Sequence, residues 1–175
     1  MDKNKAVCKV VYDFDDVMIG LNKAAHEIVG LDFEDRKSYN LKKDTEAGIL
    51  TKEQADRIIE LYGDVETFKK AEIYCGFESI LDVENEGLAE VYIHSLSFNE
   101  DIKDYKLRVL KERLPDMEQS RIHMECGRDK AVMEDIDILI EDSLENIMKS
   151  KAKMANILVK KPYNRPENYG VELGQ

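Results

Sequence analysis

Ala6 to Asp13 reads AVCKVVYD and runs directly into Phe14, Asp15 and Asp16. The stretch is rich in valine and free of Gly and Pro, so it predicts a buried strand that ends at an acidic junction. Apolar residues then recur at helical spacing, at Val17, Leu21, Ala24, Ala25 and Ile28. A strand that passes through a polar junction into a helix is the opening unit of an α/β fold.

The second half of the chain alternates predicted strands and predicted helices. We expect strands at residues 89–94, 121–126, 136–140 and 157–159, and helices at residues 101–114 and 144–154. This alternation predicts a three-layer α/β fold with a parallel sheet, whose ligands bind beyond the carboxyl ends of the strands. Residues 161–175 contain Pro and Gly without an apolar period, and we expect them to be irregular.

The interval between the first two strands has helical patterns and no predicted strand. Thr51 and Gln54 have the spacing of a capping box and precede apolar residues on one helical face. A chain of 175 residues has room for one core and a modest insertion. We therefore predict a core made of residues 1–19 and 89–175, with residues 20–88 inserted as a small helical cap.

Acidic residues end two of the predicted strands. Asp13 and Asp15 are two positions apart where the first strand stops, which directs both side chains to one side. Two close carboxylates either bind a hard cation or shift each other's pKa, and Glu141 with Asp142 forms a second acidic pair. Asp13 with one acid of the second pair would suffice for Mg²⁺, which leaves positions open for phosphate oxygens.

Two further polar residues extend this pattern. Ser95 follows a predicted strand, and Lys130 lies upstream of the second acidic pair. A hydroxyl and an ammonium group can hold the remaining oxygens of a phosphate. Each has an alternative elsewhere in the sequence. Ser97 could replace Ser95, and Lys160 or Lys161 could replace Lys130.

Together these residues resemble the four motifs of the haloacid dehalogenase-like (HAD) superfamily of phosphatases. The first motif, a strand followed by Asp-x-Asp-x-Thr or Val, is matched in full by VVYDFDDV at residues 10–17. Val91 to Ser95 resembles the second motif, Lys130 resembles the third, and Ile138 to Asp142 resembles the fourth. The resemblance covers nearly the whole chain and implies a Rossmann-like core with a small helical lid.

Within the superfamily, the chain is similar to the 5'(3')-deoxyribonucleotidases. The similarity lies in Asp129-Lys130, in Leu139 to Asp142, in Asn146-Ile147 and in Pro162 to Asn164. It implies a Mg²⁺-dependent phosphomonoester hydrolase, a nucleotidase that releases phosphate from nucleoside or deoxynucleoside monophosphates. Two alternatives stay open, which are a HAD phosphatase for another small phosphoester and a catalytically weak binding or regulatory protein that retains the pocket.

The resemblance also implies roles for single residues. Asp13 would attack phosphorus and form an aspartyl-phosphate, while Asp15 would act as acid to the leaving group and then as base for water. Ser95 and Lys130 would bind the phosphate. Splitting hydrolysis into two assisted steps agrees with the known advantage of covalent catalysis.

A magnesium site is implied by the same resemblance. Its ligands would come from Asp13, the backbone carbonyl of Asp15, Glu141 and Asp142. The chain departs from the nucleotidase pattern at Glu141, where Asp is usual, and at Leu96, where a small polar residue is usual. A glutamate is one methylene longer, so the first departure would alter the distance to the metal.

The insert holds aromatic residues that could stack on a nucleobase. Tyr39 and Phe68 are the candidates that we assign to the substrate pocket. Aromatic residues in a small helical lid also form its core, so either environment is open for these two.

Composition restricts the partners and the location. A net charge of −11 argues against a nucleic-acid duplex as partner, since such binding depends on basic side chains. No apolar run approaches the length of a membrane span, and the N-terminus lacks the pattern of a secretory signal. Cys8, Cys75 and Cys126 lack zinc-site spacing, which favours reduced thiols. We expect a cytoplasmic protein that acts on a small-molecule phosphomonoester, and a homodimer is an allowed assembly.

Overall fold

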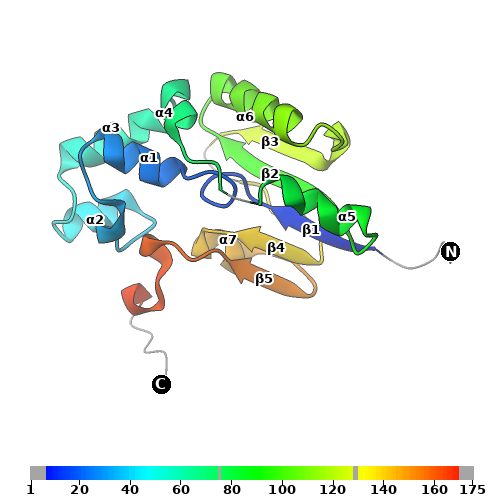
Figure 1. Ribbon diagram of the computed structural model, residues 1–175. Coiled ribbons are helices and arrows are strands. Elements are labelled where there is room, and N and C mark those ends of the chain that lie inside the picture. Colours follow the sequence, from blue (N-terminus) through cyan, green and yellow to red (C-terminus); the bar gives the residue numbers. More distant parts are fainter. Residues whose placement is uncertain (1–6, 75, 128–129, 170–175) are drawn as a thin grey trace.

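The computed structural model describes residues 7–74, 76–127 and 130–169 of the chain (Figure 1). The strands are β1 (Cys8–Tyr12), β2 (Ala89–Ser97), β3 (Ile122–Cys126), β4 (Ile138–Glu141) and β5 (Ala155–Leu158). The α-helices are α1 (Leu21–Ile28), α2 (Leu41–Glu46), α3 (Lys52–Leu61), α4 (Val65–Lys70), α5 (Asp82–Asn85), α6 (Glu100–Arg113) and α7 (Leu144–Lys149). Short 3-10 helices are η1 (Phe33–Asp35), η2 (Glu78–Leu81), η3 (Gln119–Arg121), η4 (Pro162–Asn164) and η5 (Pro166–Tyr169).

All five strands pair in parallel in the order β3-β2-β1-β4-β5. Tyr12, the last residue of β1, lies opposite Ile93 of β2 on one side and Ile140 of β4 on the other. The predicted parallel sheet is therefore confirmed. Because β1 is central and the chain leaves it toward both edges, the carboxyl end of β1 is the switch point at which α/β folds bind ligands.

Helices cover both faces of the sheet, so the predicted three layers are present (Figure 1). On the face covered by α5 and α6, Phe14 and Ile93 pack with Ile102 and Leu110 of α6. On the opposite face, Val11 and Leu139 form a smaller cluster against Ile147 of α7. Burial of apolar side chains on both faces is what a parallel sheet requires.

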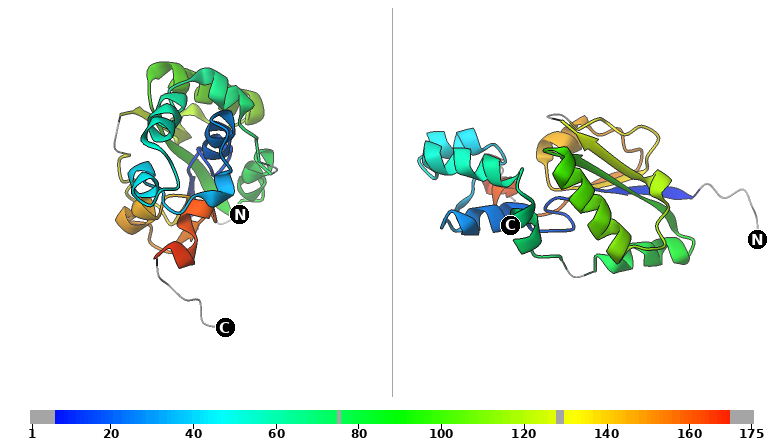
Figure 2. Two further views of the ribbon diagram at one scale, coloured as in Figure 1. Left: turned by 90° about the vertical axis from the view of Figure 1, so that its left-hand side faces the viewer. Right: turned by 90° about the horizontal axis from the view of Figure 1, so that it is seen from above.

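Helices α1 to α4 gather beyond the carboxyl ends of the strands and form a lid there (Figure 2). This lid has an apolar core of its own, built from Ala25, Leu50, Ala55, Ile58 and Leu61. At the start of α3, the Thr51 hydroxyl accepts from Gln54 N at 3.1 Å and the Gln54 side chain accepts from Thr51 N at 2.9 Å. The capping box predicted from these two residues is therefore confirmed.

Two linkers run side by side between the lid and the sheet. Gly20 N donates to Glu72 O at 2.8 Å, which ties the outgoing linker to the returning one. Farther along the returning segment, the ring of Phe77 packs edge-on against Phe14 with centroids 6.2 Å apart, and α5 lies on β2. These contacts join residues 77–85 to the core sheet. The division of the chain at residues 20 and 88 stays a prediction, and the contacts favour a lid that ends before Phe77.

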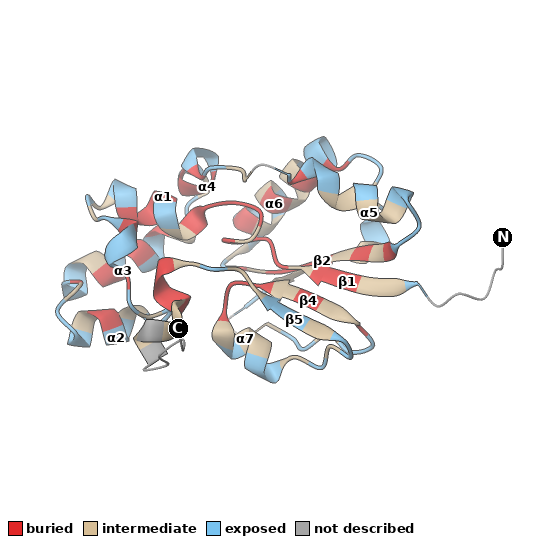
Figure 3. Cartoon of the chain, turned by 60° about the horizontal axis from the view of Figure 1, so that its bottom comes forward, coloured by how far each residue is buried: buried red, intermediate tan, exposed pale blue. Residues whose placement is uncertain are grey.

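The segment after β5 differs from the sequence-based expectation. It forms η4 and η5 instead of an irregular tail, and Pro162, Tyr163 and Asn164 are buried where it passes between lid and sheet (Figure 3). Asn164 accounts for this order, because its side-chain amide donates to Asp142 O at 2.7 Å and to Val159 O at 2.8 Å. Ile28, expected to face inward on α1, is 37% exposed.

Two structural observations concern membrane crossing and the cysteines. Within the described residues, no helix combines the length and the apolar character that a membrane crossing needs. Cys8 and Cys126 are free thiols, and Cys75 lies outside the described residues.

Candidate active site

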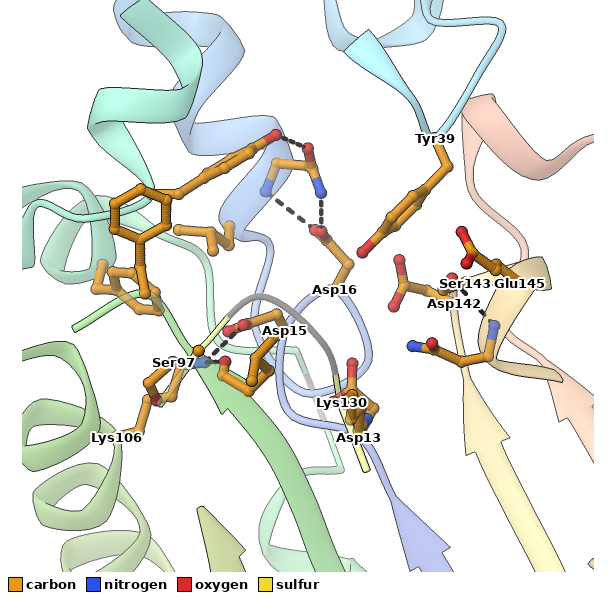
Figure 4. A pocket seen from close by; sticks show the side chains of 18 of the residues that line it. Asp13, Asp15, Asp16, Tyr39, Ser97, Lys106, Lys130, Asp142, Ser143 and Glu145 are labelled. Carbon is orange, nitrogen blue, oxygen red and sulfur yellow. Dashed lines mark hydrogen bonds and ion pairs between the residues drawn. The ribbon is translucent and has the colours of Figure 1, made fainter. Parts of the chain in front are cut away.

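A cavity of about 420 Å³ lies between the lid and the carboxyl edge of the sheet (Figure 4). The core contributes charged side chains to its wall, namely Asp13, Asp15, Asp16, Lys106, Lys130, Asp142, Glu145 and Lys149. The lid contributes mostly apolar and aromatic groups, namely Leu21, Asn22, Tyr39, Tyr62 and Phe68. The core side of the cavity can therefore bind charged groups, either an anion or a metal cation, and the lid side can bind an apolar group.

Lys130 bridges the two acidic strand ends. Its ammonium group donates to Asp13 Oδ1 at 2.6 Å and to Glu141 Oε2 at 2.9 Å. Burial alone lowers the pKa of Lys130, but the charges of Asp13 and Glu141 outweigh burial and raise it. Lys130 therefore stays a cation beside the nucleophile candidate. The adjoining residue Asp129, part of the sequence resemblance, lies outside the described residues.

Asp13, Glu141 and Asp142 place carboxylate oxygens within 4.8 Å of one another, all in buried residues. Burial and the neighbouring acids raise the pKa of Glu141 and hold the pKa of Asp142 well above its usual range. Such mutual repulsion is relieved by a bound cation.

The donor atoms of this acidic cluster fit Mg²⁺, which takes oxygen ligands from few carboxylates. Glu141 Oε1 is held by the backbone N–H groups of Asp142 and Ser143, at 3.2 and 3.1 Å. The Tyr163 hydroxyl donates to Asp142 Oδ2 and so fixes that side chain. These contacts orient the carboxylates before any cation arrives.

Asp15 is held by a lysine that sequence reasoning did not select. Lys106 Nζ donates to Asp15 Oδ2 at 2.6 Å, to Ser95 Oγ at 3.0 Å and to Leu96 O at 2.8 Å. The lysine side chain is fully buried, with its ammonium 5.6 Å from the Phe14 ring centroid. Burial raises the pKa of Asp15, and Lys106 opposes that shift.

The signal for Lys106 is present in the sequence. It lies four residues after Ile102 and four before Leu110, both buried on the inward face of α6. A lysine on an apolar helical stripe needs a buried partner, because an unpaired charge in the interior is costly. Asp15 and Ser95 are those partners, and only the fold brings them there.

Ser95 and Ser97 occupy different environments on β2. Ser95 is completely buried, and its hydroxyl contacts Lys106. Ser97 lines the cavity, and its buried hydroxyl has no hydrogen-bond partner among the described residues. Asp15 Oδ1 is buried and unpartnered in the same sense. Both residues line the same cavity, and a buried polar group without a partner calls for an explanation such as a catalytic role or a bound group.

The Asp16 side chain stabilises the local structure at the start of α1. It has a φ of 54°, a left-handed conformation that Asp adopts more readily than most residues. Its carboxylate accepts from Asn22 N at 3.1 Å and from the Asn22 side chain, which satisfies a free N–H at the start of α1. Burial raises the pKa of Asp16 to about 7.

The two aromatic candidates from the lid both line the cavity. Phe68 is 3% exposed and also belongs to the apolar cluster around Phe14, so it serves packing as well as the wall. The Tyr39 hydroxyl points into the cavity toward Asp16 and Asp142 (Figure 4). Tyr39 is 48% exposed as a residue, but burial of its hydroxyl end and the charges of Asp142 and Asp13 hold its pKa well above the usual range.

Comparison with protein families identifies the chain. Residues 5–170 match the family described as 5' nucleotidase, deoxy (pyrimidine), cytosolic type C protein. The chain belongs to this family. The resemblance to deoxyribonucleotidases is thereby confirmed, and the protein is a phosphatase of the nucleotidase type that acts on phosphomonoesters.

Solved structures match the chain over most of its length at low sequence identity. A hydrolase from Pseudomonas syringae is 14% identical, with a TM-score of 0.50, and the match covers 96% of this chain and 88% of that one. A predicted phosphatase from Clostridium acetobutylicum is 15% identical over 95% of this chain and 92% of its own, with a TM-score of 0.41. A search of curated proteins gives no match.

Proposed function

We propose that the protein is a Mg²⁺-dependent nucleotidase that releases phosphate from nucleoside or deoxynucleoside monophosphates through an aspartyl-phosphate on Asp13. The observation that carries the proposal is the arrangement around Asp13. Its carboxylate ends the central strand, with the Lys130 ammonium 2.6 Å away and two further acids adjacent. An anion would otherwise be repelled by these acids, so the cationic groups decide what can bind.

The reaction has two steps. An Asp13 oxygen attacks phosphorus, the bond from phosphorus to the nucleoside oxygen breaks, and Asp15 gives a proton to that oxygen. Water then attacks the phosphorus and loses a proton to Asp15, and the bond to Asp13 breaks to release inorganic phosphate. The buried and unpartnered Asp15 Oδ1 supports Asp15 as the group that moves the proton.

Phosphate oxygens would be held by Lys130 and by a hydroxyl from β2. Ser95 is the residue that matches the family motif, and Ser97 is the alternative favoured by its position on the cavity wall. Mg²⁺ bound by Asp13, Glu141, Asp142 and the backbone of Asp15 would neutralise charge on the phosphoryl group. Lys130 would share that neutralisation because it stays protonated.

Lys106 would act as a positioning residue. Its ammonium joins Asp15 to the end of β2, so the proton-transferring acid and the phosphate-binding strand keep one geometry. Holding reacting groups in place supplies a large share of catalysis in such sites.

The lid supports a nucleoside as the leaving group. Leu21 and Phe68 give the cavity an apolar wall, and Phe98 extends it on the core side. A flat, weakly polar base fits such a wall better than a sugar phosphate does. Tyr62, whose hydroxyl donates to Asn22, adds a polar group on the same wall.

The test is phosphate release by the purified protein with Mg²⁺ and with chelator. The substrates are ribo- and deoxyribonucleoside 5'- and 3'-monophosphates together with several sugar phosphates. We expect Mg²⁺-dependent release from nucleotides, and we expect Asp13→Asn to abolish it. Asp104→Asn, a change of the same kind on the exposed side of α6, serves as the control and should retain activity.

Faster turnover of sugar phosphates than of every nucleotide would exclude the nucleotidase assignment and favour another small phosphoester. Full activity of Asp13→Asn would remove Asp13 from the nucleophile role. Binding of phosphate without turnover of any substrate would favour a binding or regulatory protein.

We also propose a location and an assembly. The description of the matching family as cytosolic supports a cytoplasmic location. A homodimer stays a prediction, which light scattering of the purified protein would check.

A further inference from the structure

The lid contains a buried ionic cluster that the proposed reaction does not use. Arg36, Asp44 and His26 are each 1% exposed, and the guanidinium Nε of Arg36 donates to Asp44 Oδ2. Nη1 of Arg36 lies 3.0 Å from His26 Nε2, which accepts, and His26 Nδ1 donates to Asn22 O at 2.6 Å. Buried ion pairs are weak devices for stability, since apolar side chains of similar volume often do as well. The cluster is therefore better explained by the chain segment that it holds in position than by a gain in stability.

The remaining nitrogen of the guanidinium holds the loop between η1 and α2. Nη2 of Arg36 donates to Ser38 O at 2.5 Å and to Tyr39 O at 3.2 Å. Contacts also hold the two ends of this loop. Lys37 N donates to Asp44 Oδ1 at 3.3 Å, and the Asn40 side chain caps α2. Arg36 thus fixes the backbone of the residue whose side chain enters the cavity.

Tyr39 reaches from this loop to the acidic cluster of the core. Its ring packs edge-on against Tyr163 with centroids 5.5 Å apart, and the Tyr163 hydroxyl donates to Asp142. The Tyr39 hydroxyl points into the cavity between Asp16 and Asp142 (Figure 4). A phenol is a donor at neutral pH, and it faces the region above Asp13 and Asp142 where a phosphoryl group would lie.

We propose that the Tyr39 hydroxyl donates a hydrogen bond to the phosphoryl group of the substrate, and that Arg36 is the positioning residue that holds Tyr39 there. This inference rests on the proposed function and deepens it, since the lid then contributes to the phosphoryl site as well as to the nucleoside site. It also gives Tyr39 a role different from stacking on a base.

The experiment compares Tyr39→Phe, Arg36→Lys and the double variant in steady-state kinetics with a nucleoside monophosphate. Loss of one hydrogen bond to a charged group should lower kcat/KM on the order of 10- to 100-fold in Tyr39→Phe. Arg36→Lys should lower it to a similar extent, because one ammonium cannot replace the forked contacts. The double variant should be no worse than the poorer single variant, since both changes remove the same contact.

Matched controls are available for both changes. Arg57→Lys alters an exposed arginine of the lid that pairs with Glu60, and Tyr92→Phe alters a tyrosine on β2 away from the cavity. Both controls should keep wild-type kinetics. Unfolding by urea, measured on every variant, separates loss of the contact from loss of the fold.

Wild-type kinetics in Tyr39→Phe would overturn the role of Tyr39. Multiplied losses in the double variant would overturn the role of Arg36 as the residue acting through Tyr39. If Arg36→Lys does not fold, Tyr39→Phe alone still decides whether the hydroxyl contributes.

Calorimetric binding of inorganic phosphate keeps this inference separable from the proposed function. If the wild type hydrolyses no substrate, the proposed function fails, yet phosphate binding can still be compared between wild type and Tyr39→Phe. Binding weakened about 10-fold in Tyr39→Phe would support the contact, at the lower end of the range for a charged hydrogen bond. Equal binding, or none by either protein, would overturn it.

Discussion

Stability against acid offers a quantitative test of the buried cluster in the lid. Burial lowers the pKa of His26 from its ordinary value of 6.5 to about 4. The charged groups beside the ring are Arg36 and Asp44, and a proton on Nε2 would point an N–H at the guanidinium. The unfolded chain therefore binds a proton at a pH where the folded protein does not.

The sign follows from this difference. The contribution of His26 to stability is fully present above pH 6.5 and is lost as the pH falls from 6.5 toward 4. With these two pKa values, the free energy of unfolding at pH 5 should be lower than at pH 8 by about 2 kcal/mol from His26 alone.

Urea unfolding of the wild type and of His26→Gln at pH 8 and pH 5 isolates this contribution. Glutamine keeps a polar side chain at the site and does not titrate, so the carboxylates shared by both proteins cancel in the comparison. The wild type should lose about 2 kcal/mol more than the variant between the two pH values. An equal loss in both proteins would refute the neutral, buried histidine.

Three further predictions concern single contacts. Lys106→Met removes the partner of Asp15 and should lower the free energy of unfolding by about 3 kcal/mol, whereas unchanged urea unfolding would contradict a buried ion pair. Thr51→Ala should cost about 1 kcal/mol through loss of the capping box, and Thr51→Ser should restore most of it in the same assay. Ser95→Ala should raise KM about 10-fold if its hydroxyl binds phosphate. A larger rise in KM for Ser97→Ala would instead assign phosphate binding to Ser97.

Local patterns sufficed for the elements that position the chemistry. The valine-rich stretch ending at Tyr12 is β1, and the apolar run before Glu141 is β4, as predicted. Periodicity identifies such elements because side chains alternate across a strand and recur along a helix face. Since parallel strands present their carboxyl ends at one edge, the order of elements was enough to predict that Asp13 and Asp142 meet.

Sequence patterns did not predict the contacts between side chains that are far apart in the chain. Lys106 was predicted only as part of a helix, yet its ammonium lies against Asp15, 91 residues earlier in the chain. Tyr163 belongs to a segment expected to be irregular, yet its hydroxyl fixes Asp142.

The sequence by itself determined the parallel sheet, the helical lid and the acidic edge of β1 and β4, because these depend on residue periodicity and on the order of elements along the chain. Only the tertiary structure decided which lysine pairs with which acid and which lid residue reaches the core. Those pairings depend on distances between side chains from separate elements. Such distances follow from how the lid and the helices pack on the sheet, and local sequence spacing carries no information about them.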